Sequence, residues 1–248
     1  MKSNTVKRVA VTGAVILLWI AVWYVCALFV NSKLFLPSPT DTFIALIELL
    51  GTWEFYKVVL FTMLRVVLGL AVGILFGIAL AILCHRFSVI KSIFNPLISV
   101  IRATPVATFI VLLWILVKGN ALTVIIAFLM VMPIVWQNTL DGFESIPKDL
   151  IEVSSVFGLT FKKKMKVLIF PILKSFLFPA IITSVGLAWK SEIAAEIIAY
   201  TRSSIGMYIN DAKTYMQTPT VFAWTVVIIA LSITLEKITK ALLGRALK

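Results

Sequence analysis

Five charged side chains interrupt the apolar stretches of this sequence, and they are the groups there that could do chemistry. Glu192 and Glu196 are four residues apart, which places both carboxylates on one face of a helix. Lys190, Arg65 and Arg102 are the cations available to them. A charge at the centre of a membrane span costs about 2.5–3.5 kcal/mol, so these groups should face a partner or a water-filled cavity. Three interpretations stay open: a polar lining, a structural ion pair that fixes helix register, or residues that simply lie near the outer interface.

Nucleophiles and metal ligands are sparse. The chain has one histidine, His85, and two cysteines, Cys26 and Cys84, both in apolar segments without C-x-x-C spacing. This pattern favours neither a disulfide framework nor a zinc site. A glycine-rich G-x-x-x-x-G-K-[ST] loop, which would hold nucleotide phosphates, is absent from the sequence. We therefore expect no catalytic residue, no metal and no cofactor.

The most polar segment, residues 141–174, is predicted to form a helix–glycine–helix elbow. Pro147 can begin the first helix, and Gly158 can end it in the left-handed conformation. The apolar face of this helix consists of Leu150, Ile151, Val153, Val156 and Phe157. Residues 161–169 restart as a basic amphipathic helix, and Pro171 marks the start of the next apolar segment. Such an elbow suits an anionic lipid surface or a groove on a partner protein.

The elements that carry these residues are predicted membrane spans. Hydrophobic residues make up 61% of the 248 positions, well above the share in soluble domains. A helix needs about 20 apolar residues to cross a bilayer. The candidates are Val9–Val30, Val66–Cys84 (extending back to about Val58), Ala103–Val117 (lengthened by Ile93–Ile101), Ala121–Leu140, Ser175–Trp189 (continuing toward Tyr200) and Thr214–Leu235. We expect an all-α integral membrane protein with about six transmembrane helices. It would form one domain over 1–248, with a peripheral first helix at 9–30 and core helices at about 58–240.

Basic residues predict the orientation of the spans. The net charge of +12 is assigned to loops at the cytoplasmic face and not to nucleic-acid binding. With the N-terminus inside, the inside segments hold Lys2, Lys7, Arg8, Arg86, Lys91, Lys148, Lys162, Lys163, Lys164, Lys166, Lys174, Lys237, Lys240, Arg245 and Lys248. The outside segments hold only Lys33, Lys57, Lys118, Arg202 and Lys213. The excess favours N-in and C-in, with 141–174 cytoplasmic.

Three local patterns predict packing and turns. Gly69, Gly73 and Gly77 repeat every four residues, a pattern that lets helices approach closely. They could pack within one subunit, which is the commoner case, or between two. Pro39 is predicted to begin a short surface helix, and Lys118–Asn120 to form a tight turn.

The elbow resembles the "EAA" loop of ABC importer permeases. That loop reads Glu-Ala-Ala, three residues, Gly, nine residues, then Ile-x-Leu-Pro. Here Glu152-Val153-Ser154 is followed by three residues and Gly158, and nine residues later by Leu168-Ile169-Phe170-Pro171. The spacing matches throughout, while Val153 and Ser154 replace the two alanines.

Further stretches are similar to the nitrate/sulfonate/taurine-type permeases within that family. They are Trp189 with Ala194-Ala195-Glu196, Ser204-Ile205-Gly206, Phe222-Ala223-Trp224-Thr225, Leu36-Pro37-Ser38-Pro39 and Arg102-Ala103-Thr104-Pro105. The resemblance covers nearly the whole chain. It implies a type I ABC importer permease (MetI-like) fold in the bacterial plasma (inner) membrane, crossing it several times.

The resemblance also implies partners and residue roles. Such a permease is a translocating subunit and not an enzyme, usually a homodimer in the bilayer. Cytoplasmic ABC ATPase subunits bind the ATP, and an extracytoplasmic binding protein delivers the substrate. The implied ATPase-coupling residues are Glu152, Ser154, Ser155, Val156, Phe157 and Gly158. The candidates for a translocation path or gate are Lys190, Glu192, Glu196, Arg65 and Arg102.

The substrate stays open at this stage. The resemblance implies a small solute such as a nitrate-, sulfonate- or taurine-like anion, and the cation Lys190 favours an anion slightly. A neutral vitamin or pyrimidine precursor is the alternative. A self-sufficient channel or secondary transporter is a third possibility, although no internal repeat of the kind common in secondary transporters is visible.

Overall fold

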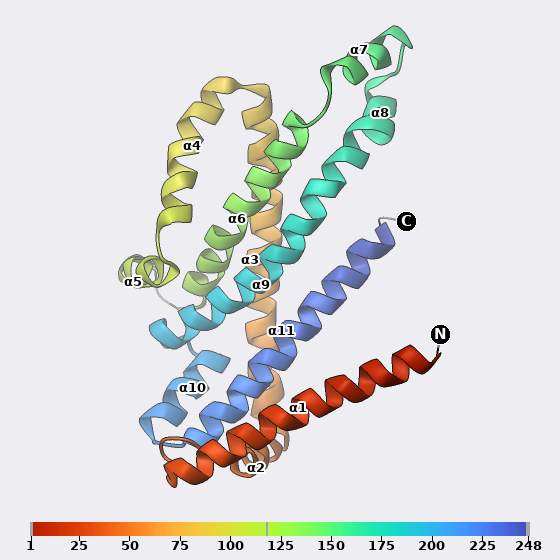
Figure 1. Cartoon of the computed structure of the whole chain (residues 1–248). Helices are drawn as coiled ribbons and strands as arrows, with labels where there is room; N and C mark the ends of the chain where they lie inside the picture. The colour runs from red at the N-terminus through yellow and green to blue at the C-terminus, as the bar shows by residue number, and fades with distance from the viewer. Residues whose placement is uncertain (1, 118, 247–248) are drawn as a thin grey trace. The chain divides into compact units, whose positions relative to one another are not determined.

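The computed structural model describes residues 2–117 and 119–246 (Figure 1). Within these ranges the regular structure is entirely helical. The elements are α1 (Lys2–Val30), α2 (Pro39–Leu50), α3 (Trp53–Arg86), α4 (Ser88–Ala103), α5 (Val106–Leu116), α6 (Asn120–Glu144), α7 (Lys148–Val156), α8 (Phe161–Lys164), the π-helical segment η1 (Met165–Ile169), α9 (Phe170–Ala199), α10 (Ile205–Thr214) and α11 (Thr218–Ala246). The predicted short helix after Pro39 is confirmed as α2.

Membrane-spanning length is reached by five of the described segments. They are Val11–Val30, Trp53–Arg86, Asn120–Glu144, Phe161–Ala199 and Thr218–Gly244. The pair α4 and α5 provides a sixth if it is counted as one broken span, with a bend of 106° between its halves. The prediction of an all-α membrane protein with about six spans is confirmed.

The third predicted span is not one straight helix. It breaks between α4 and α5, because Pro105 lacks a backbone N–H and disfavours helical torsions in the residue before it. Thr104 accordingly has φ −82° and ψ 129°, which is extended backbone. The fifth predicted span is longer than expected, since the helix continues through Pro171 and does not begin there. In η1 the N–H of Phe170 bonds to the carbonyl of Met165, five residues back, so the helix is already wider where proline enters it.

The chain divides into two compact units. One comprises Met1–Val58 and Tyr208–Ile229, and the other comprises Val59–Met207 and Ala230–Lys248. The single permease domain predicted over 1–248 stays a prediction. Lys118, part of the predicted tight turn, lies outside the described residues, and α6 begins two residues later.

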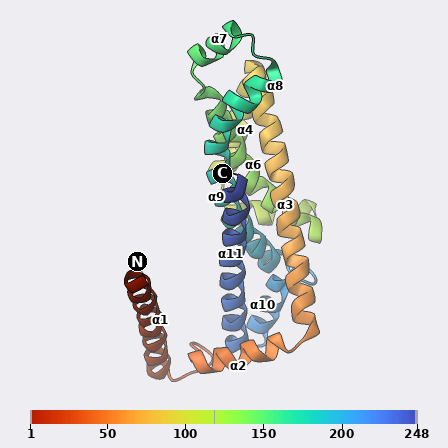
Figure 2. The ribbon, with the colours of Figure 1, turned by 90° about the vertical axis from the view of Figure 1, so that its right-hand side faces the viewer.

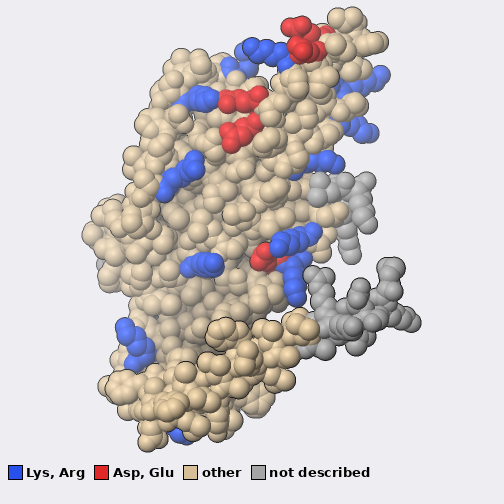
Figure 3. Space-filling view, in the orientation of Figure 1, with Lys and Arg blue, Asp and Glu red and all other residues tan. Residues whose placement is uncertain are grey.

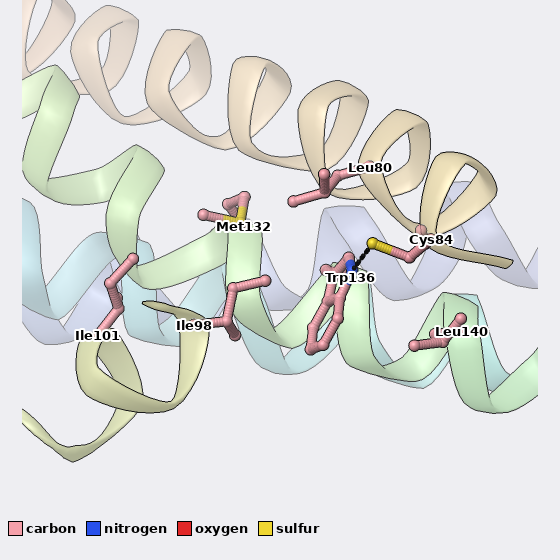
Figure 4. Packing of buried hydrophobic residues seen from close by; sticks show 8 residues of the cluster. Leu80, Cys84, Ile98, Ile101, Met132, Trp136 and Leu140 are labelled. Atoms are coloured by element: carbon pink, nitrogen blue, oxygen red, sulfur yellow. Dashed lines mark hydrogen bonds between the residues drawn. The ribbon is translucent and has the colours of Figure 1, made fainter. Parts of the chain in front are cut away.

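The larger unit is built on the antiparallel pair α6 and α9, which lie side by side in Figures 1 and 2. Its apolar core joins α3, α4 and α6 (Figure 4). The buried members shown there include Leu80, Cys84, Ile98, Ile101, Met132, Trp136 and Leu140. The indole N–H of Trp136 donates to Cys84 Sγ at 3.4 Å, so the buried ring has a hydrogen-bond partner.

The glycine repeat is the contact between α3 and α6. A Cβ on Gly69 would lie 2.6 Å from Ala127 Cβ, and one on Gly73 would lie 2.8 Å from Val131 Cβ. Likewise, a Cβ on Gly77 would lie 2.9 Å from the backbone oxygen of Met132. The interpretation as packing within one subunit is confirmed.

The smaller unit is held by aromatic side chains and a helix cap. The indole N–H of Trp23 donates to the carbonyl of Pro37 at 3.0 Å, and its ring stacks on Phe222. Ser38 and Asp41 form a capping box at the start of α2. From residue 11 to 30 the apolar side chains of α1 are mostly exposed, as lipid-facing residues would be.

Candidate functional site

Three of the five predicted intramembrane charges meet in one buried cluster. Arg65 projects from α3 toward the C-terminal part of α9, where Glu192 and Glu196 share a helix face as predicted. Its Nη2 lies 2.6 Å from Glu196 Oε1, and its Nε lies 3.5 Å from Glu192 Oε1. Both glutamates are 0% exposed and Arg65 is 7% exposed. Burial to this degree requires charges to be paired, which is what the cluster achieves.

Glu196 is bound from several sides. Thr62 Oγ1 donates to its Oε1 at 2.8 Å, and the backbone N–H of Gly206 donates to its Oε2 at 3.1 Å. The same hydroxyl of Thr62 accepts the N–H of Ile205 at 3.2 Å. The carboxylate therefore ties α3 and α9 to the first residues of α10.

Gly206 is required by this geometry. A Cβ at that position would lie 2.4 Å from Glu196 Cβ and 2.5 Å from the backbone nitrogen of Ile197. Only glycine lets the start of α10 approach α9 so closely that its N–H reaches the carboxylate. The Ser204-Ile205-Gly206 stretch seen in the sequence thus forms part of the cluster.

The turn between α9 and α10 holds strained backbone. Tyr200 and Ser203 have φ of +52° and +51°. A left-handed torsion in a non-glycine residue costs of order 1–3 kcal/mol and persists only where its surroundings enforce it. Here the carbonyl of Ser203 accepts Arg65 Nη2 at 3.3 Å, and the N–H of Thr201 bonds to the carbonyl of Glu196 at 3.2 Å. The cluster and the turn therefore stabilise each other.

Glu192 is the less satisfied member. Neither of its carboxylate oxygens makes a well-formed hydrogen bond among the described residues, and its nearest polar neighbours are Arg65 Nε, at 3.5 Å, and the side chain of Thr123. One guanidinium thus serves two carboxylates. The arrangement resembles a register-fixing ion pair more than a water-lined passage, and a role of these three residues in the path or gate stays a prediction.

The other two predicted path residues lie elsewhere. Lys190 is exposed on α9 and is electrostatically coupled to Glu236 of α11. Arg102 is exposed at the end of α4, where it lines a separate cavity of about 220 Å³. Sequence reasoning therefore grouped five charges, of which the structure brings three together.

Sequence reasoning also missed partners of the cluster. Thr62 was available from its spacing, because it lies three residues before Arg65 and shares its helix face. Ser203 contributes a carbonyl oxygen, and Asn120 Oδ1 accepts Arg65 Nη1 at 3.4 Å. No sequence signal marks these two, because both contacts join segments far apart in the chain.

The predicted elbow is present at the far end of α9 from the charge cluster. Helix α7 ends with Gly158 at φ +62°, in the left-handed conformation predicted for it. The N–H of Gly158 bonds to the carbonyl of Ser155, and the N–H of Leu159 bonds to that of Ser154, both at 3.0 Å. This pair of bonds is the Schellman motif, which satisfies carbonyls at a helix end.

The elbow has an anchored side and an exposed side. Ser154 is buried and Ser155 accepts a 2.7 Å hydrogen bond from Lys164 Nζ, which braces α7 against α8. Glu152 is exposed, and Val156 and Phe157 are 86% and 77% exposed. On the face shown in Figure 3, Lys and Arg side chains gather near α7 and α8, and Asp and Glu side chains lie beside them at α7. The tip of the elbow thus presents apolar side chains beside basic ones.

These features define a multi-spanning helical protein with an exposed elbow between two long packed helices. Residues 73–247 match the family of binding-protein-dependent transport system inner membrane components. The chain belongs to this family. It is therefore an ABC importer permease, a multi-pass protein of the inner membrane and a translocating subunit that is not itself catalytic.

Individual proteins show the same likeness. The chain is 28% identical to the taurine transport system permease protein TauC of Escherichia coli K12, over 90% of this chain and 83% of TauC. It is 26% identical to the putative aliphatic sulfonates transport permease protein SsuC of Bacillus subtilis 168, over 84% and 76%. The bicarbonate transport system permease protein CmpB of Synechocystis is 28% identical over 60% of this chain and 53% of its own length.

A solved structure shares the fold. An inward-facing form of the MetNI methionine ABC transporter contains a chain that superposes with a TM-score of 0.62, covering 79% of this chain and 97% of that one. The sequence identity is 14%, so this likeness concerns the fold alone. It confirms the predicted type I importer permease architecture.

Proposed function

We propose that this permease imports a small oxyanion, of the sulfonate, taurine or bicarbonate kind. The names of three relatives support this substrate class, since each denotes a permease for a solute that carries an anionic oxygen group. A neutral vitamin or pyrimidine precursor remains the second candidate. It is less favoured because the two exposed cations of the predicted path set, Lys190 and Arg102, would have no counterpart on a neutral solute.

The proposed assembly contains two copies of this chain, two cytoplasmic ABC ATPase subunits and an extracytoplasmic binding protein. Both termini and the elbow would lie in the cytoplasm, as the distribution of basic residues predicts. ATP would bind to the ATPase subunits, and this chain would need no cofactor of its own.

The proposed coupling element is α7 with its glycine-capped end. The observation that carries this step is the exposure of Val156 and Phe157 on a short, braced helix. Large apolar side chains exposed in water favour a partner, and a short helix fits a groove on the ATPase subunit. Glu152, on the exposed side of α7, would add a charged contact there, while Ser154, Ser155 and Gly158 would fix the shape of the elbow.

Coupling then requires two conformations of the permease. ATP can drive import only if the ATPase pair binds these conformations with different affinity. The long helix Phe161–Ala199 joins the elbow to the buried charge cluster. Since Arg65 fixes the far end of that helix to α3, movement of the elbow would displace both helices together instead of bending one.

Reconstitution tests the proposal. The chain, the ATPase subunit and the binding protein of its own transport system would be combined in lipid vesicles. Uptake of radiolabelled taurine, butanesulfonate, bicarbonate and a neutral aminopyrimidine would be measured with ATP inside. We expect ATP-dependent uptake of at least one anion and none of the pyrimidine. Uptake of the pyrimidine alone would instead establish the second candidate.

A further inference from the structure

A cavity of about 220 Å³ lies beside the break between α4 and α5, and none of the three charged residues of the cluster lines it. Arg102 and Thr104 line it from the break, Met130 and Pro133 from α6, and Leu187 from α9. All of these residues belong to the larger unit. The cavity is therefore bounded by elements of one compact body.

The break itself indicates a functional place in a membrane protein. Non-helical backbone at membrane depth is tolerated only where it is buried in protein or lines a cavity. The extended Thr104 and the 106° bend after it are backbone of this kind, and they adjoin the cavity. Pro133 opposite cannot donate to the carbonyl of Leu129, which also lines the cavity. Broken helices supply substrate-binding groups in many transporters.

Arg102 is the charged group of this cavity. Among the described residues no carboxylate lies within ion-pair distance of it, whereas Arg65 is already committed to two. The neighbouring walls are apolar apart from the hydroxyl of Thr104, which donates to the carbonyl of Val100 at 2.8 Å. An exposed guanidinium that lies beside apolar walls and has no counter-ion leaves its N–H donors available to an anion.

We propose that this cavity is a binding site for the transported oxyanion on its path through the permease, with the guanidinium of Arg102 as the binding group. The inference rests on the proposed function, and it adds the site and the residue. Arginine offers two parallel N–H donors that match the oxygens of a sulfonate or carboxylate. A volume of about 220 Å³ suits a solute of a few heavy atoms, below the ~300–1,000 Å³ of sites for drug-sized ligands.

The test compares Arg102→Gln and Arg102→Lys with the unaltered chain in the reconstituted importer. The readout is anion uptake per ATP hydrolysed at saturating binding protein. We expect Arg102→Gln to lower this ratio about tenfold or more, since a charge-assisted bidentate contact is lost. Arg102→Lys should give an intermediate ratio, because lysine keeps the positive charge but lacks the two parallel N–H donors of the guanidinium. The matched control is Arg86→Gln, an exposed arginine over the ring of Phe87, which should behave as the unaltered chain.

The outcomes separate the two proposals. If the unaltered chain imports an anion and Arg102→Gln keeps the uptake per ATP hydrolysed within twofold, the cavity is not a binding site for the transported anion, and the proposed function stands. If the unaltered chain imports no anion, both are overturned. A phospholipid phosphate is the other oxyanion that could reach Arg102. If Arg102→Gln loses co-purifying anionic lipid while uptake stays intact, the cavity binds lipid, and the proposal that it binds the transported anion is overturned.

Discussion

Nη2 of Arg65 lies 2.6 Å from Oε1 of Glu196, and this buried contact joins α3 to the end of α9 more than a hundred residues later in the chain. The contact also organises the turn that follows α9, since the same nitrogen reaches the carbonyl of Ser203. The cluster therefore connects two spans, α3 and α9, to the turn that follows α9.

Replacing Arg65 by Met should destabilise the protein strongly. Two buried carboxylates would lose their only ion-pair partner among the described residues, and breaking such a pair costs about 3–5 kcal/mol. Thermal unfolding in detergent measures the loss. The control Glu236→Gln removes half of an exposed pair with Lys240 and should shift the unfolding midpoint little, because solvent screens such pairs. Equal unfolding midpoints for the two variants would mean that the cluster contributes nothing special.

Gly206→Ala should be destabilising although it adds a single methyl group. The new Cβ would overlap the backbone of Glu196 and Ile197, which cannot rotate away as a side chain end would. We expect about 1–3 kcal/mol, the usual cost of overpacking. A Cβ on Gly186, which lies on α9, would meet no atom within 4 Å, so Gly186→Ala serves as the control. A variant Gly206→Ala as stable as Gly186→Ala would contradict the close approach described here.

The charged cap of α2 should make its N-terminus sensitive to acid. Hydrogen bonds from Lys33 and from Ser38 hold the pKa of Asp41 below its ordinary value. A carboxyl with a lowered pKa stabilises the folded state above its ordinary pKa of about 4, and this contribution is lost as the pH falls through the lowered value. Hydrogen exchange in residues 38–50 should therefore increase, beyond the intrinsic effect of pH, when the pH drops below about 4. Asp41→Asn should show no such step, and a step in that variant would rule out Asp41 as its source.

The left-handed end of α7 gives a prediction about the elbow alone. Alanine at position 158 would meet no neighbouring atom, but it would keep φ +62° at a cost of about 1–2 kcal/mol. We expect faster hydrogen exchange in α7 with unchanged global unfolding. Gly244→Ala, also without neighbours and within α11, should leave α7 unaffected. Slower or equal exchange in the position-158 variant would show that the left-handed torsion is not needed.

Local patterns in the sequence predicted the elements that depend on local physics. The elbow followed from Pro147, Gly158 and the apolar spacing between them, because caps and turns are set by a few neighbouring residues. The glycine repeat likewise predicted close packing, since a missing Cβ has the same consequence in any fold. Pro105 could have indicated the bend between α4 and α5, but hydropathy alone favoured a continuous span there.

The tertiary partners could not be predicted in this way. The pairing of Glu192 and Glu196 on one face follows from helical spacing, but the choice of Arg65 over Lys190 or Arg102 depends on which helices pack together. The carbonyl of Ser203 is available only because that turn adopts a strained torsion. Such contacts depend on long-range packing, which no spacing rule encodes.

The central claim is that α7 couples this permease to an ATPase, and co-purification tests it most directly. Phe157→Ser would be expressed with the ATPase subunit of its own transport system, beside the unaltered chain and the control Val167→Ser. Val167 is comparably exposed at 69% but lies in η1, away from the tip of the elbow. We predict that the ATPase subunit is retained by the unaltered chain and by Val167→Ser, and that Phe157→Ser loses it along with ATP-dependent uptake. Full retention and unchanged uptake in Phe157→Ser would contradict the coupling role of α7.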